Sequence, residues 1–150
     1  MAERLDPVSP LSVLSVAWAY YFSGRNDDGL AQIHRVLDLD PASISAHGML
    51  LGAYEMAGQY EAAVSRAEIW LRMAGLPPSC ADDLARAWKD GGEQGYWQAR
   101  LVLVERAPAC FGPKPIVYAY LHAQIGQHDQ AIDYLEQGFD ERLGAMVFIA

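Results

Sequence analysis

The residues of this chain best suited to chemistry are two cysteines and four histidines. The histidines are His34, His47, His122 and His128. His122 and His128, the closest pair, are six residues apart and do not share a helix face. Cys80 and Cys110 have neither metal-ligand spacing nor a CxxC motif, and no nearby basic partner is indicated that would activate either thiol. We therefore expect no metal site, and whether the two cysteines pair stays open.

Three pairs of adjacent carboxylates could in principle supply an acid and a base. They are Asp27-Asp28, Asp82-Asp83 and Asp140-Glu141. Each pair lies at or near the end of an expected helix, and the first two fall in first turns, where the helix dipole favours negative charge. The chain also lacks nucleotide-binding, zinc-protease and nucleophile-elbow motifs. We therefore expect no catalytic residue, no cofactor and no enzyme. An enzyme with a site between helices is the weakest alternative.

Composition and charge limit the class of protein and of partner. The 150 residues are 52% hydrophobic and 20% charged, which is typical of one folded domain. The net charge is −8, and Lys89 and Lys114 are the only lysines, so a nucleic-acid or anionic-membrane surface is not expected. No apolar stretch resembles a signal core or a membrane span, so we expect a cytoplasmic protein.

Glycines at a constant interval divide the chain into similar segments. They lie 34 residues apart, at Gly24, Gly58, Gly92 and Gly126. Apolar residues on both sides of each glycine follow the 3.6-residue period of an amphipathic helix, and no long stretch alternates with period two. We therefore predict an all-α fold of eight helices with no sheet. The expected helices are about 10–23, 26–38, 44–57, 60–73, 79–90, 94–106, 114–125 and 128–139.

The pattern resembles the tetratricopeptide repeat (TPR) family, whose repeat has the form W-x2-L-G-x2-Y, then A-x3-F, then P. The second segment matches it as His47-x2-Leu50-Leu51-x2-Tyr54, then Ala63-x3-Ala67. The resemblance implies one domain over 1–150, a right-handed α-solenoid of about four helix–turn–helix units. The expected units are about 10–43, 44–77, 78–111 and 112–145, with 146–150 beginning an incomplete further unit. The third unit and the proline-rich segment 106–115 also resemble TPR regions of bacterial winged-helix regulators, adenylate cyclases and kinases.

Two residues depart from the family pattern. Leu51 and Trp97 occupy positions that usually hold a small residue, which lets paired helices approach closely. We therefore expect the third unit to pack more loosely or at a shifted angle. Gly95 is expected to supply the close approach that Trp97 denies.

In the resembled family the first helix of each unit lines a concave groove. The expected partner-binding residues on these helices are Trp18, Tyr21, Met49, Met56, Arg86 and Tyr120. Leu14, Trp18 and Met49 stand where some family members carry a carboxylate clamp, so a chaperone C-terminal peptide is not the expected ligand. The alternative for Trp18, Tyr21 and Phe22 is that they cover the neighbouring helix or a preceding unit.

The resemblance implies a scaffold that binds a partner protein or peptide in this groove. The alternative is the effector or sensor region of a bacterial transcriptional regulator or signalling protein. Both ends of the array look open, because Leu5-Asp6-Pro7 occupies a closing position and Met146-Val147-Phe148-Ile149 would begin another unit. A homodimer through an open end is therefore expected.

Overall fold

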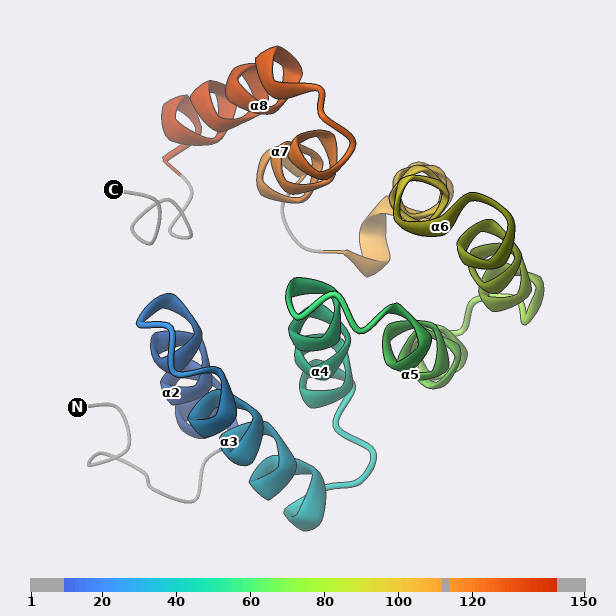
Figure 1. Cartoon of the computed structure of the whole chain (residues 1–150). Coiled ribbons are helices and arrows are strands. Elements are labelled where there is room, and N and C mark those ends of the chain that lie inside the picture. Colours follow the sequence, from blue (N-terminus) through green and yellow to red (C-terminus); the bar gives the residue numbers. More distant parts are fainter. Residues whose placement is uncertain (1–9, 112–113, 143–150) are drawn as a thin grey trace. The chain divides into compact units, whose positions relative to one another are not determined.

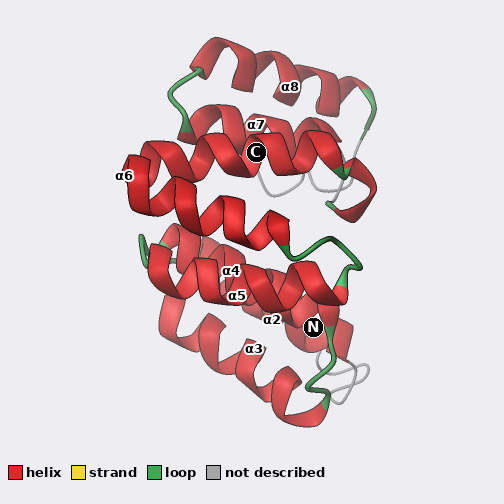
Figure 2. Cartoon of the chain, turned by 90° about the vertical axis from the view of Figure 1, so that its right-hand side faces the viewer, coloured by secondary structure: helices red, strands yellow, loops and turns green. Residues whose placement is uncertain are grey.

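The computed structural model describes residues 10–111 and 114–142. This part of the chain consists of helices and connecting turns and contains no strand, which confirms the predicted all-α class (Figures 1 and 2). Its α-helices are α2 (Pro10–Phe22), α3 (Asn26–Leu39), α4 (Ile44–Met56), α5 (Tyr60–Met73), α6 (Ser79–Arg106), α7 (Lys114–Gln124) and α8 (His128–Asp140). A short 3-10 helix (Pro108–Cys110) follows α6 in the proline-rich segment.

The prediction of eight helices is wrong by one, because the described residues form seven α-helices. The two helices expected at 79–90 and 94–106 belong to the single element α6, in which only Gly92 leaves the helical region (φ 57°, ψ −147°). Glycine adopts a positive φ without steric strain, because it has no Cβ. One glycine therefore bends α6 sharply without a connecting loop.

Three of the regularly spaced glycines end helices in the same way. Gly24, Gly58 and Gly126 have φ values of 74°, 67° and 80°. The N–H of the residue after each glycine donates to a carbonyl five residues earlier: Arg25 to Tyr20 (2.9 Å), Gln59 to Tyr54 (2.9 Å) and Gln127 to His122 (2.8 Å). This is the hydrogen bond of a Schellman motif, which satisfies carbonyls at a helix end. The interval read from the sequence is therefore an interval between identical turns.

The chain forms two compact units, Met1–Ala81 and Asp82–Ala150. In the first unit, α2 and α3 form one helical hairpin and α4 and α5 form another (Figure 1). A shared core joins α2, α3 and α4, and Ser43 caps α4 by accepting a hydrogen bond from the Ala46 N–H (3.4 Å). The buried members of this core are Val13, Leu14, Ala17, Ile33, Val36, Ala46, Leu50 and Ala53.

Small residues in the first unit let large rings lie directly on a helix backbone. A Cβ on Gly29 of α3 would come within 2.9 Å of the Tyr21 ring of α2. A Cβ on Gly48 of α4 would come within 3.0 Å of the Trp70 indole of α5. The glycines thus set the distance between the helices of each pair.

In the second unit, the two halves of α6 approach at Gly95. A Cβ on Gly95 would collide with the carbonyl oxygen of Ala87 in the first half. This confirms the expectation that Gly95 supplies the close approach that Trp97 denies. Trp97 itself is buried, in edge-to-face contact with Tyr96 at 5.2 Å between ring centroids. Leu51, the other bulky departure from the family pattern, is also buried.

The pair α7 and α8 packs through rings and small residues. Tyr134 of α8 stacks on His122 of α7 (5.3 Å) and contacts Tyr118 (5.2 Å). Ala131 and Gly138, also on α8, are buried. One side of α8 is therefore committed to α7.

Candidate functional site

Three of the six expected binding residues, Trp18, Arg86 and Tyr120, belong to a series of equivalent positions on the first helix of each pair. Trp18, Gly52, Arg86 and Tyr120 succeed one another at intervals of 34 residues. Trp18 is 41% exposed, Arg86 is exposed, and Gly52 and Tyr120 are partly exposed. We call these four positions the accessible column. Gly52 is the one member that is not among the six expected binding residues, and the 34-residue interval identifies it.

The position one residue earlier in each helix behaves differently. Ala17, Leu51 and Ala119 are all buried, and Ala85 is partly buried. Because successive residues on a helix are about 100° apart, the core side and the accessible column lie on different faces of the same helices. Of the two faces, the one that carries the accessible column is the one that a partner can reach.

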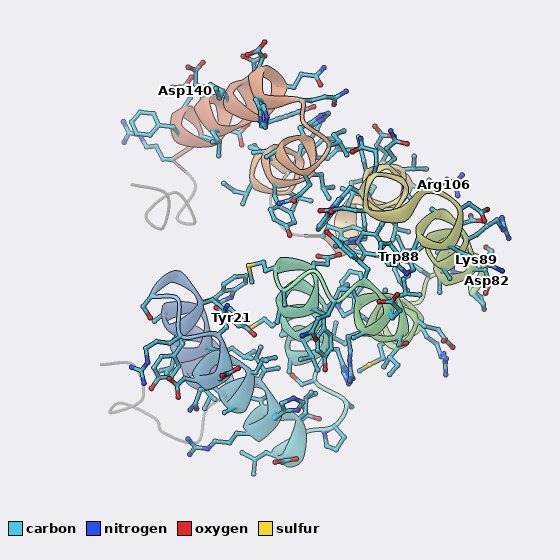
Figure 3. All side chains as sticks on the ribbon, viewed as in Figure 1. Tyr21, Asp82, Trp88, Lys89, Arg106 and Asp140 are labelled. Carbon is cyan, nitrogen blue, oxygen red and sulfur yellow. The ribbon has the colours of Figure 1, made fainter. Side chains whose placement is uncertain are left out.

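Tyr21 is a packing residue as well as a neighbour of Trp18. The two rings meet edge to face at 6.5 Å. Tyr21 extends from α2 toward α4 (Figure 3), its ring lies on Gly29, and its buried hydroxyl has no hydrogen-bond partner within the described residues. Burial first, and then the neighbouring Tyr54 and Asp27, raise the pKa of Tyr21 to about 12. The alternative that this ring covers a neighbouring helix therefore holds for Tyr21.

The two methionines of the predicted site differ in burial. Met49 is partly buried and packs against the core of the first unit. Met56, the last residue of α4, is 51% exposed. Gly52 lies one turn before Met56, and a Cβ there would meet nothing within 4 Å. In the first unit, Trp18 and Met56 are thus the exposed apolar members of the predicted set, and Gly52 leaves room beside Met56.

In the second unit, Arg86 and Tyr120 have different local partners. The Arg86 guanidinium donates to the Asp83 carboxylate at 3.3 Å, and both side chains are largely exposed. Asp83 also pairs with Arg106 at the far end of α6 (3.5 Å). Tyr120 packs edge to face on the buried Trp97 at 5.5 Å. Arg86 therefore presents a charge on the surface, while Tyr120 is anchored to the core with part of its ring accessible.

Of the four histidines, His47 and His122 are buried, whereas His34 and His128 are exposed. Arg66 donates to Nδ1 of His47 (2.9 Å), so the Nε2 proton is the one available to the Pro41 carbonyl (3.0 Å). His122 donates from Nδ1 to Gln127 (2.6 Å) across the turn at Gly126. Both buried imidazoles thus have structural hydrogen bonds.

The described part of the chain contains no cluster of metal-ligating side chains and no disulfide. Over residues 10–111 and 114–142, no group of three or more His, Cys, Asp or Glu side chains is placed to hold a metal ion. Cys80 and Cys110 are free thiols and are partly buried. No helix in the same residues has the length and apolar character required to cross a bilayer.

The chain was compared with known proteins at the level of families and of individual sequences. No protein-family model matches it, and no curated protein matches it. The accessible column and its local chemistry are therefore the basis for an assignment of function.

Proposed function

We propose that this chain is a TPR-type α-solenoid that binds a partner protein or peptide along the accessible column of its first helices. The observation that carries the proposal is the contrast between two neighbouring positions. Trp18, Gly52, Arg86 and Tyr120 are accessible at each recurrence, whereas the preceding position is buried or partly buried. Within each unit, accessible positions at one register on successive first helices suit recognition of an extended or helical segment.

The identical turns support the repeat part of the proposal. The Schellman hydrogen bonds at Gly24, Gly58 and Gly126 recur at multiples of 34 residues, which is the length of a TPR unit. Packing of the Tyr21 ring on Gly29 gives the close helix approach that such a hairpin requires. These features are local to each helix pair.

The side chains of the column, together with Met56 one turn after Gly52, indicate the chemistry of the partner. Trp18 and Met56 are exposed apolar side chains, of the types that dominate binding energy at protein interfaces or adapt to varied apolar partners. Arg86 adds a surface guanidinium. We therefore propose a partner segment with large apolar side chains and at least one acceptor for Arg86.

Affinity capture followed by mass spectrometry tests the proposal, with the 150-residue chain as bait. The partner's affinity is then measured for Trp18→Ala, Arg86→Ala and the control Val102→Ala, whose side chain is as exposed as Trp18 (43% against 41%) but lies on the second half of α6. We expect Trp18→Ala to weaken binding by at least about 30-fold. Equal affinity of Trp18→Ala and Val102→Ala would reject the column as the binding surface.

A further inference from the structure

A second apolar surface lies on α8, outside the accessible column. Ile132 and Phe139 are 53% and 72% exposed, and Leu135 between them is partly exposed. Their spacing of three and four residues places them on one side of the helix. This side is distinct from the one that carries Ala131, Gly138 and Tyr134 against α7. We call Ile132, Leu135 and Phe139 the α8 stripe.

The same positions on α3 are covered by another helix. Three 34-residue steps before the α8 stripe lie Leu30, Ile33 and Leu37. Ile33 is fully buried, and Leu30 and Leu37 pack against a core that includes residues of α4. On α3, therefore, these positions are where the next helix packs. On α8 the equivalent side chains are largely exposed.

Four carboxylates border the α8 stripe. They are Asp129, Asp133, Glu136 and Asp140, and all four are exposed. Their spacing of four, three and four residues forms a second line along the helix, directly beside the stripe. Asp140 lies on the side of α8 that faces away from α7 (Figure 3). A shallow hollow lined by Leu135, Glu136, Phe139 and Asp140 joins the apolar and acidic lines.

This acidic border is particular to α8. The equivalent positions on α3 are Asp27, Ala31, His34 and Asp38, which include two carboxylates instead of four. Within the described residues, no hydrogen bond or ion pair neutralises any of the four carboxylates on α8. Exposed like charges spaced at three and four residues repel one another. A cationic partner would relieve that repulsion.

We propose that the α8 surface is a docking site for an amphipathic helix of a partner protein, with apolar side chains on the α8 stripe and Lys or Arg side chains against the four carboxylates. Helix docking of this kind buries apolar residues at i, i+3, i+4 and i+7, and complementary charge sets the orientation and increases the association rate.

Charge complementarity favours this occupant over two others. A second copy of the chain, docked through the same face, would bring a second acidic line of Asp129, Asp133, Glu136 and Asp140 into the interface. The segment 143–150 of the chain itself contains no Lys or Arg, so it offers no cation to the carboxylates. A basic amphipathic helix satisfies both the apolar and the acidic line.

The test uses the full chain and a synthetic probe. The probe is a peptide of about five helical turns with Leu on one face and Lys along its flanks, and the comparison peptide has Glu in place of Lys. Binding is followed by fluorescence anisotropy. We expect the Lys peptide to bind and the Glu peptide not to bind. Phe139→Ala and the double variant Glu136→Lys/Asp140→Lys should each weaken binding by at least about tenfold.

Two matched controls separate the site from general attraction to an acidic protein. Leu39→Ala removes a similarly exposed apolar side chain (62%) from the end of α3. Asp38→Lys/Asp90→Lys makes the same change in net charge at two exposed acids outside α8. Both controls should bind within about twofold of the unchanged chain.

Four outcomes overturn the proposal. The Lys peptide fails to bind, or it binds the α8 variants as tightly as the controls. Light scattering shows a dimer that Phe139→Ala disrupts, which would make a second copy the occupant. Phe148→Asp strengthens peptide binding by tenfold or more, which would make the segment 143–150 the occupant. Failure of the accessible column in its own test leaves this result unaffected, because Trp18 and Arg86 take no part in it.

Discussion

Gly95 faces the carbonyl oxygen of Ala87 so closely that even a methyl group on its Cα would collide with that oxygen. The two residues belong to the two halves of α6, which bends at Gly92. Trp97, two residues beyond Gly95, is almost completely buried. The absence of a side chain at position 95 thus allows the backbones to approach while the large indole occupies the core.

We predict that Gly95→Ala destabilises the chain by about 2–3 kcal/mol, because the halves of α6 must separate to admit the methyl group. Thermal unfolding followed by circular dichroism measures the change. Gly91→Ala is the control, since a Cβ there meets nothing within 4 Å. Ala favours helix over Gly, so this variant should be neutral or slightly more stable. Equal loss in both variants would contradict the close approach.

Tyr21→Phe is expected to increase the free energy of unfolding by up to about 1 kcal/mol, because it removes a buried hydroxyl that has no hydrogen-bond partner within the described residues. Urea unfolding at neutral pH measures the effect. Tyr20→Phe is the control on the same helix. Destabilisation by Tyr21→Phe would show that its hydroxyl has a partner, such as an ordered water molecule.

Alkaline pH should weaken the fold partly through Tyr21. Burial, with smaller effects of Tyr54 and Asp27, raises its pKa from 10.0 to about 12, so between these values the unfolded chain releases a proton that the folded chain retains. The contribution of this pKa shift to the free energy of unfolding is therefore fully present below pH 10 and is lost as pH rises toward 12. The pKa of Tyr118 is raised too, by burial and then by Glu105 and Tyr134, so it acts in the same direction. Urea midpoints measured across this range should fall less steeply for Tyr21→Phe than for the unchanged chain.

The hydrogen bond between Arg66 and His47 is predicted to couple α5 to α4. His47→Phe should cost about 1–3 kcal/mol, because the partly buried guanidinium loses its acceptor. A double-mutant cycle with Arg66→Ala should give a coupling energy of about 0.5–3 kcal/mol. The exposed pair Arg72 and Glu68 (2.7 Å) is the control, for which Arg72→Ala should cost less than about 1 kcal/mol. Strict additivity at His47 and Arg66 would argue that the bond contributes nothing.

Alanine substitution should destabilise the chain more at the buried Trp97 than at the partly exposed Trp18. Trp97 is 1% exposed and Trp18 is 41% exposed. Trp97→Ala should cost about 3–5 kcal/mol, as expected for a large core side chain. Trp18→Ala should cost less, about 2 kcal/mol, since 41% of its surface is already in water. Chemical denaturation of both variants gives the comparison, and similar losses would mean that Trp18 is a core residue and unavailable to a partner.

The helical class and the positions of the turns could be predicted because both depend on local interactions. The 3.6-residue apolar period specifies an amphipathic helix wherever it occurs. Gly24, Gly58, Gly92 and Gly126 adopt positive φ, which glycine tolerates and other residues resist. The one error in helix count arose at Gly92, because a kink at one residue and a short loop between two helices require the same glycine.

Which aromatic side chains face outward was decided by tertiary structure. Trp18, Tyr21 and Tyr120 are all large rings on first helices, and nothing in their own sequence neighbourhood distinguishes them. Tyr21 is drawn into the core because Gly29, on the next helix, leaves space for its ring, and Tyr120 is held against Trp97. Trp18 remains 41% exposed. Burial depends on the side chains that another helix supplies, and the periodicity of one helix does not contain that information.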